Sequence, residues 1–255
     1  MIRSFTLILL LATLALTGFP AGLEAEEGPV PAGTMWDRAT WVPHADFVVG
    51  NPHWRWPNPG GTNPSPGTDV TVTYSLSGLA DLGLPCDQVR AAVEEALGLW
   101  AAVAPLHFVE VRDSGPCPSS NDPNYDATGL PQLRFGSHTE DGPRGMLAHA
   151  YFPFSPSPNG LAGDVHFDCE ENWSIGAGSG VFDFLEVCLH EIGHAIGLGH
   201  EPTPPGGNSA IMNPFYGGRF TGLGTGFLLQ DDINGVQAIY GVGDTTSGWR
   251  MWTLF

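Results

Sequence analysis

Basic side chains are scarce in this chain of 255 residues. It has nine arginines and no lysine against 27 aspartates and glutamates, so its formal net charge at pH 7 is −18. A surface of this sign repels polyanions, which argues against nucleic acid as a partner. The acidic excess is suited to two other uses, which are calcium binding and the solvation of a soluble surface.

Long hydrophobic runs are also missing, except near the start. Residues 5–16 carry no charge, follow Arg3, and lead to the small residue Ala25 before Glu26. The run is shorter than the roughly 20 residues that a helix needs to cross a bilayer. It predicts that residues 1–25 are a secretory signal peptide and that the protein is secreted, with no stable membrane insertion. An uncleaved anchor is the alternative.

Cysteine is limited to four residues, and none of them precedes Cys86. In an exported chain an even number suggests two disulfides, and four cysteines allow three connectivities. We expect Cys86 to pair with Cys117, and Cys169 with Cys188. Free thiols are one alternative, and a metal thiolate at Cys169 is another.

The chain does contain a dense metal-binding pattern, HExxHxxGxxH, formed by His190, Glu191, His194, Gly197 and His200. On a helix, His190 and His194 lie four residues apart and therefore on one face, where their imidazoles can share a metal. Gly197 allows the positive φ that ends the helix and reverses the chain. This reversal would return His200 as a third ligand.

This pattern predicts hydrolytic chemistry. Zinc held by three neutral imidazoles keeps a fourth position for water, whose pKa falls to about 7 when bound. Glu191 would take a proton from that water as it attacks a carbonyl, and would pass the proton to the departing amine. Peptide bonds are the expected substrate. The alternative is a chance string on an ordinary amphipathic helix, which five fixed residues argue against.

The segment from Ser209 to Tyr216 reads SAIMNPFY. It resembles the Met-turn of the metzincin clan of zinc proteases, and within that clan Pro214 and Tyr216 resemble the matrixin family. The resemblance implies that Met212 forms a hydrophobic floor under the metal. It also implies that Pro214 to Tyr216 line the pocket for the residue after the scissile bond. Leu189 is expected to shape the depth of that pocket.

Further segments support the same resemblance. Residues 230–241 are similar to the last helix of matrixin catalytic domains, and residues 87–105 resemble the first. The motif helix carries an apolar stripe at spacings of four, three and four, typical of a helix packed on a core. Short runs rich in β-forming residues lie at 70–74, 106–111 and 131–136.

We therefore expect residues 68–242 to form an α+β domain of the zincin-like metzincin type. The resemblance implies a twisted mixed sheet, three helices, and an active-site cleft between an upper and a lower part. Residues 26–67 are rich in glycine, proline and tryptophan and are expected to be an arm or a short propeptide. Residues 243–255 are expected to be a C-terminal tail.

A second segment rich in metal ligands precedes the motif helix. Matrixins place a structural zinc and calcium in this region. By position, the resemblance implies a zinc site of three histidines and one carboxylate: His138, His149, His166 and Glu140. It implies calcium ligands, with one backbone carbonyl among them, at Asp141, Gly142, Asp164, Asp168 and Glu171.

The segment from Ala148 to Ala150 resembles the edge strand along which matrixins bind their substrates. Ala148 and Ala150 would then pair with an extended peptide through main-chain hydrogen bonds. The sequence thus predicts a secreted, monomeric zinc-dependent endopeptidase acting on extended or unfolded proteins. Two alternatives remain open. One is a catalytically silent zinc-binding or adhesive domain, and the other is a narrow-specificity processing protease with a dedicated partner.

Overall fold

The fold is described from a computed structural model of the chain. It describes residues 55–57, 65–115, 117–118, 131–153, 161–176, 178–201 and 210–243. The expected signal peptide, most of the expected arm and most of the expected tail lie outside these ranges. Within them, no helix is long and apolar enough to cross a membrane.

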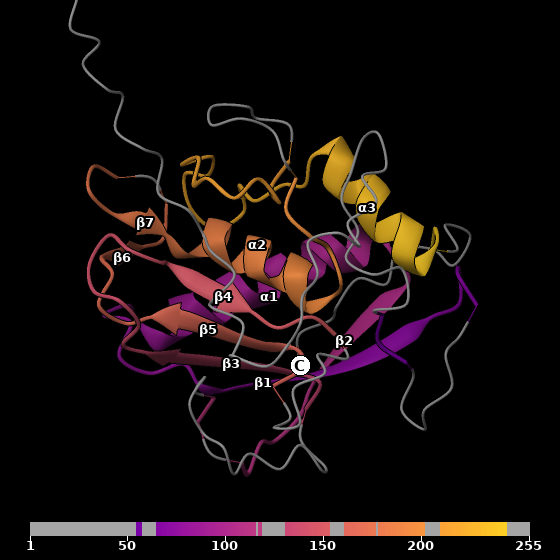
Figure 1. Ribbon diagram of the computed structural model, residues 1–255, viewed down its shortest axis with the longest axis horizontal. Coiled ribbons are helices and arrows are strands. Elements are labelled where there is room, and N and C mark those ends of the chain that lie inside the picture. Colours follow the sequence, from indigo (N-terminus) through magenta and orange to yellow (C-terminus); the bar gives the residue numbers. More distant parts are fainter. Residues whose placement is uncertain are drawn as a thin grey trace, which may run out of the picture.

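A five-stranded mixed sheet forms one layer of the molecule (Figure 1). β1 (Val70–Gly78) lies between β2 (Leu106–Glu110) and β3 (Leu133–His138), β5 (Asp164–Asp168) follows β3, and β4 (Ala148–Ala150) lies outermost. β2, β1, β3 and β5 run parallel to one another, and β4 is antiparallel to β5. The expected mixed sheet is confirmed, and β4 is an edge strand.

Three helices and a small second sheet complete the described part of the chain. The helices are α1 (Cys86–Val103), α2 (Phe184–Ala195) and α3 (Gln230–Tyr240). β6 (Trp173–Ser174) pairs in parallel with β7 (Phe182–Asp183), directly before α2. Figure 1 shows α1 and α2 on the same side of the large sheet, with α3 further away. The α+β fold class is confirmed.

Local signals in the sequence account for the helix ends. α1 ends at Val103, two residues before Pro105, which cannot donate a helical hydrogen bond. α2 begins after Asp183, whose side chain accepts a hydrogen bond from the N–H of Leu185 at 3.0 Å, an N-cap. α3 ends at Tyr240 and is followed by Gly241, which adopts a φ of 87°. The motif helix therefore starts at a fixed point next to the sheet.

The core joins the two long helices through one tryptophan. Trp100 of α1 is fully buried, and its Nε1–H donates to the carbonyl of Leu189 in α2 at 3.0 Å. Phe167 of β5 packs against Phe184 at the start of α2, with ring centroids 4.7 Å apart. Each large apolar side chain buried in this way contributes about 1.5–3 kcal/mol. Packing on both sides thus holds α2 rigidly in place.

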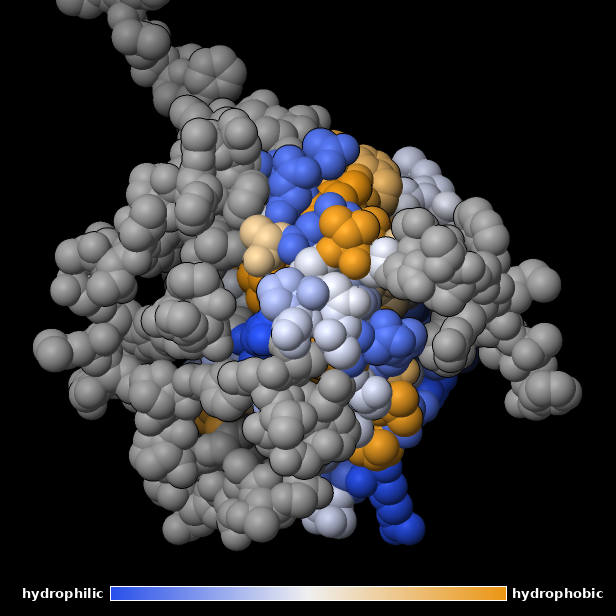
Figure 2. Space-filling view, turned by 90° about the vertical axis from the view of Figure 1, so that its right-hand side faces the viewer, coloured by the Kyte–Doolittle hydropathy of each residue, from blue (hydrophilic) through white to orange (hydrophobic). Residues whose placement is uncertain are grey.

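Large apolar side chains are mostly kept away from the described surface. The exposed ones in the described ranges are Val109, Leu223, Phe227 and Val242. Figure 2 views the side of the molecule that carries α3 in Figure 1, and hydrophilic and hydrophobic residues are interspersed over its coloured part.

Candidate metal centres and the adjoining cavity

Three histidine side chains meet at the C-terminal end of α2. The Nε2 atom of His190 lies 3.0 Å from Nε2 of His194 and 3.2 Å from Nε2 of His200. The ligand atoms of this group all lie within 4.8 Å of one another. Three imidazole nitrogens at such spacing can share a single metal ion.

A tight chain reversal brings the third histidine back to the helix. Gly197 adopts a φ of 110°, a region that residues with a Cβ rarely enter. The N–H of Gly197 donates to the carbonyl of His194 at 2.8 Å, and the N–H of Leu198 donates to that of Gly193 at 2.9 Å. These bonds satisfy carbonyls at the helix end and turn the chain toward His200.

Backbone carbonyls orient the two helical imidazoles. Nδ1 of His190 lies 2.8 Å from the carbonyl oxygen of Ile211, and Nδ1 of His194 lies 2.7 Å from that of Leu198. A carbonyl can only accept, so each Nδ1 carries the proton and each Nε2 lone pair is left for a metal. Burial lowers the pKa of His190 to about 4 and that of His194 well below its usual value. Both rings are therefore neutral near pH 7, the form that binds zinc.

The expected general base and Met-turn lie against the same helix. Glu191 follows His190 in α2 and has no exposed surface. Met212 is 2% exposed, and a Cβ added at Gly193 would clash with its Sδ atom. The absence of a side chain at Gly193 therefore lets this turn pack directly on α2 beside the histidines.

A buried carboxylate of α3 holds the Met-turn in place. Asp232 is 2% exposed and accepts hydrogen bonds from the N–H groups of Ile211 at 2.9 Å, Met212 at 3.1 Å and Leu229 at 2.9 Å. Asp232 is therefore the carboxylate through which α3 anchors the Met-turn. Because Ile211 also accepts from His190, α3 supports the histidine cluster through one intervening residue.

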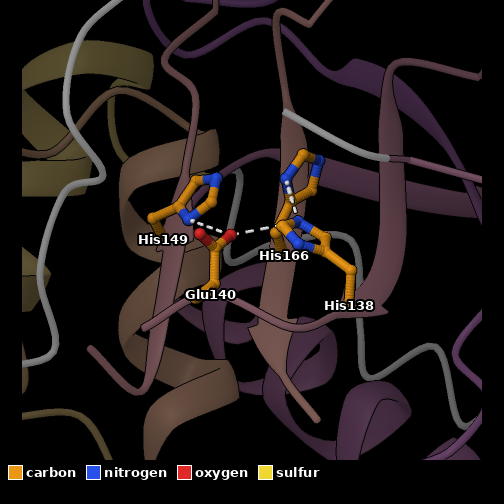
Figure 3. Close-up of side chains that lie close together, drawn as sticks. All are labelled: His138, Glu140, His149 and His166. Carbon is orange, nitrogen blue, oxygen red and sulfur yellow. Dashed lines mark hydrogen bonds and ion pairs between the residues drawn. The ribbon is translucent and has the colours of Figure 1, made fainter. Parts of the chain in front are cut away.

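A second cluster lies where three strands of the sheet end or meet (Figure 3). Oε1 of Glu140 lies 3.0 Å from Nε2 of His138 and 3.3 Å from Nδ1 of His149, and Nε2 of His138 lies 3.2 Å from Nδ1 of His166. The sheet pairs His149 with His166 across β4 and β5. Burial lowers the pKa of His149 to about 3, and burial raises that of Glu140. Three imidazoles and one carboxylate are a suitable donor set for tetrahedral zinc.

The expected calcium ligands are arranged more loosely. Glu171 accepts a hydrogen bond from the N–H of Gly145 at 3.2 Å, and Asp141 accepts one from Met146 at 2.9 Å, so both carboxylates face one turn. Oδ2 of Asp168 is buried without a hydrogen-bond partner. Burial raises the pKa of Glu171, and the charge of Asp168 raises it further. Within the described ranges, these three do not form a cluster as tight as the two histidine groups.

A family model described as Matrixin matches residues 66–241. The chain belongs to the matrixin family. It is 37% identical over 175 residues to matrix metalloproteinase-20 of Homo sapiens, covering 67% of this chain and 31% of that protein. It is 36% identical over 174 residues to matrix metalloproteinase-25 of Mus musculus, covering 67% of this chain and 26% of that protein. It is 39% identical over 156 residues to stromelysin-3 of Mus musculus, covering 61% of this chain and 27% of that protein.

The family resemblance inferred from the motifs is thereby confirmed. Each alignment covers less than a third of the relative, so this matrixin spans only part of the length of the proteins it matches.

Asp164, an expected calcium ligand, lies beside a buried guanidinium, and its role in calcium binding stays a prediction. Nη1 of Arg134 lies 3.7 Å from Oδ2 of Asp164, and its Nε lies 2.5 Å from Oδ2 of Asp113. All three side chains are almost fully buried. Both carboxylate oxygens of Asp164 are buried without a hydrogen-bond partner. Asp164 also lies 3.8 Å from Nε2 of His166, so it supports the second histidine cluster in this matrixin.

A small cavity lies beside His190. Its volume of about 10 Å³ gives room for about one water molecule. It is lined by residues of α2 and of the segment after the Met-turn: Glu186, Val187, His190, Ile211, Asn213, Phe215, Tyr216 and Arg219. Phe215 and Tyr216 line the cavity, whereas Pro214 and Leu189 do not. Leu189 is fully buried in α2 and does not line this cavity, so its expected role in pocket depth stays a prediction.

The cysteines also differ from expectation. All four are free thiols, so neither predicted disulfide is present in this structure. Cys188 is fully buried in α2, and Cys86 and Cys117 are exposed. Burial raises the pKa of the Cys188 thiol well above its usual value, which keeps it protonated and unreactive.

Proposed function

We propose that this matrixin is a zinc-dependent endopeptidase. The observation that carries the proposal is the meeting of three Nε2 atoms, from His190, His194 and His200, beside the buried carboxylate of Glu191. Zinc held there supplies Lewis acidity and lowers the pKa of water to about 7. Family membership supports the same activity.

In this proposal, the chain's own residues handle the proton. The carboxylate of Glu191 takes the proton from the attacking water and later delivers it to the nitrogen of the leaving amine. The carbonyls of Ile211 and Leu198 hold the imidazoles of His190 and His194 in one orientation throughout. Met212 closes the site from below and excludes water from that side.

Extended peptides are the proposed substrate class. β4 is the outermost strand of the large sheet, and it pairs only with β5 in the described part of the chain. An edge strand offers free N–H and C=O groups that a substrate in the β conformation can pair with. We propose that Ala148 and Ala150 make these main-chain contacts, so only segments that are already unfolded would be cut.

The second histidine cluster is proposed to hold a structural zinc. His138, Glu140, His149 and His166 supply four donors drawn from three strands and one loop. Metal bound here would tie β3, β4 and β5 together and so fix the substrate-binding edge.

A calcium ion is proposed at the neighbouring acidic turn, held by Asp141, Asp168, Glu171 and the carbonyl of Gly142. The buried Oδ2 of Asp168 without a hydrogen-bond partner and the raised pKa of Glu171 support a divalent cation that offsets their repulsion.

We also propose export of this protein, with residues 1–25 as the signal peptide. Residues 26–67 would be an arm or a short propeptide, residues 68–242 the catalytic unit, and residues 243–255 a tail. Monomeric assembly is the simplest arrangement for such a unit. The acidic composition supports a well-solvated exported protein.

The test is cleavage of an unfolded protein by the chain as secreted, compared with a Glu191→Gln variant that keeps the side-chain shape. Loss of the general base should lower kcat/KM by at least about 10²-fold. A matched control, Glu94→Gln, changes an exposed carboxylate of α1 and should leave cleavage unchanged. Chelation should abolish cleavage, and zinc should restore it. Zinc-loaded protein that cuts nothing would instead support the adhesive-domain alternative.

A further inference from the structure

Two buried carbonyl groups follow one another at the C-terminal end of α2. They belong to Ala195, the last residue of the helix, and to Ile196, the residue after it. The last turn of a helix leaves its carbonyls without partners inside the helix. Neither residue has any exposed surface, so water is kept away from both carbonyls. The protein itself must therefore supply their hydrogen-bond donors.

One tryptophan of the expected arm reaches both carbonyls. The indole Nε1–H of Trp56 donates to the carbonyl of Ala195 at 2.8 Å, across 139 positions of sequence. The hydroxyl of Tyr240, the last residue of α3, donates to the carbonyl of Ile196 at 3.0 Å. The same hydroxyl accepts a hydrogen bond from the backbone N–H of Trp56 at 3.2 Å. Trp56 thus holds the end of α2 directly and through one hydroxyl group.

The site that receives Trp56 is built into the domain. Trp56 is buried, and a Cβ added at Gly163, just before β5, would clash with its ring. Gly163 adopts a φ of 81°, which residues with a Cβ rarely enter, so this position favours glycine twice over. The next arm residue is also held, because Nε2 of Gln132 donates to the carbonyl of Pro57 at 3.4 Å. Oε1 of Gln132 accepts from the N–H of Thr73 in β1 at 2.9 Å, which connects this contact to the sheet.

The turn that Trp56 holds lies between two histidines of the first cluster. Ala195 directly follows His194, and His200 lies beyond the end of α2. The position of His200 relative to His194 therefore depends on how this turn is held. Groups that fix the orientation of a metal ligand contribute to metal affinity without touching the metal.

We propose that Trp56 is a positioning residue for the third histidine, and that residues 55–57 of the arm stay attached to the active protein. This inference rests on the proposed endopeptidase function, because it states which part of the arm the catalytic zinc site needs. The catalytic unit then includes residues 55–57 in addition to residues 68–242. Trimming of the arm before Arg55 leaves the site intact, whereas trimming beyond Pro57 removes the indole donor beside His194.

The test is the zinc affinity of the full chain carrying Trp56→Phe, which keeps an aromatic ring and loses the Nε1–H donor. Chelator competition measures the Kd of each zinc, and the transition missing from a His200→Ala variant identifies the first site. The Kd of the first zinc should rise at least about tenfold in Trp56→Phe, and that of the second should stay unchanged. The matched control is Trp173→Phe, which removes an indole hydrogen bond of 2.8 Å to the carbonyl of Asp168. It should lower Tm and leave the first zinc unaffected.

The N-terminus of the protein that cleaves substrate provides a second readout. Mass spectrometry of the active secreted form should find Trp56 retained. An active form that begins after Pro57 and binds the first zinc with wild-type affinity would overturn the inference. A wild-type Kd for the first zinc in Trp56→Phe, or an equal rise in Trp173→Phe, would overturn it as well. The expected rise in Trp56→Phe alone, without cleavage of unfolded protein by the wild type, would count against the endopeptidase function and support the positioning role.

Discussion

Replacing Asp232 with alanine should destabilise the protein more than almost any other single change in α3. The carboxylate is 2% exposed and accepts three backbone hydrogen bonds, from Ile211, Met212 and Leu229. Each buried N–H left without a partner costs about 1–3 kcal/mol, so the loss of three partners should lower the unfolding free energy by about 3–9 kcal/mol. The value is reduced if water enters the space.

Thermal and urea unfolding of the zinc-loaded protein measure this loss. At about 2–4 °C per kcal/mol for a domain of this size, a loss of about 4 kcal/mol lowers Tm by about 8–16 °C. Zinc affinity should fall as well, because Nδ1 of His190 donates to the same turn that Asp232 holds. Asp232→Asn keeps one acceptor oxygen and should lie between the wild type and the alanine variant.

Asp87→Asn is the control for this series. It removes an exposed carboxylate in the first turn of α1, which should cost no more than about 1 kcal/mol. A Tm change for Asp232→Ala no larger than that of the control would refute the assignment of Asp232 as the anchor of the Met-turn. Unaltered zinc affinity together with a large stability loss would refute only its link to His190.

Three further predictions concern the buried charges and the metals. Arg134→Met leaves two buried carboxylates without their guanidinium and should lower the urea-unfolding free energy by about 3–5 kcal/mol; an unchanged value would contradict the ion-pair network. Glu140→Ala should release the second zinc and retain the first, as measured by metal content after dialysis; loss of both or of neither would count against separate sites. Burial lowers the pKa of His190 from 6.5 to about 4. Between pH 4 and pH 6.5 the unfolded metal-free chain therefore binds more protons than the folded metal-free chain. Stability of the metal-free protein should therefore fall by about 3 kcal/mol as pH falls through that window, and a flat profile would refute the shift.

The elements with strong local signals were predictable from the sequence. Residues 87–105 were expected to form the first helix, and the structure has a helix over Cys86–Val103. The spacing of His190, His194 and His200 predicted a three-nitrogen cluster because helix periodicity and one glycine are sufficient to bring them together. In each case the determining residues lie within one short segment of the chain.

Contacts between distant segments were not predictable in the same way. Arg134 meets Asp113 and Asp164 across the sheet, and no local period links these positions. An arginine between the apolar residues Leu133 and Phe135 was the available signal, because a buried charge needs a partner.

Two residues that line the cavity, Glu186 and Arg219, were missed for a related reason. Glu186 is a carboxylate on the helix that carries the histidines, and its partner Arg219 is 33 residues away. The sequence directed attention to Leu189, whose apolar side chain suits a pocket equally well. Only the packing of α2 decides that Leu189 contacts the core and Glu186 the cavity.

Gly193 and Met212 share a single volume in this fold. A side chain at position 193 has room only where the sulfur of Met212 now lies, so the two residues cannot both be large. In a library that varies both positions, residue size at one should be anticorrelated with residue size at the other. The two residues are 19 positions apart in the sequence. A substitution at either position would nevertheless limit which side chains the other position can accept.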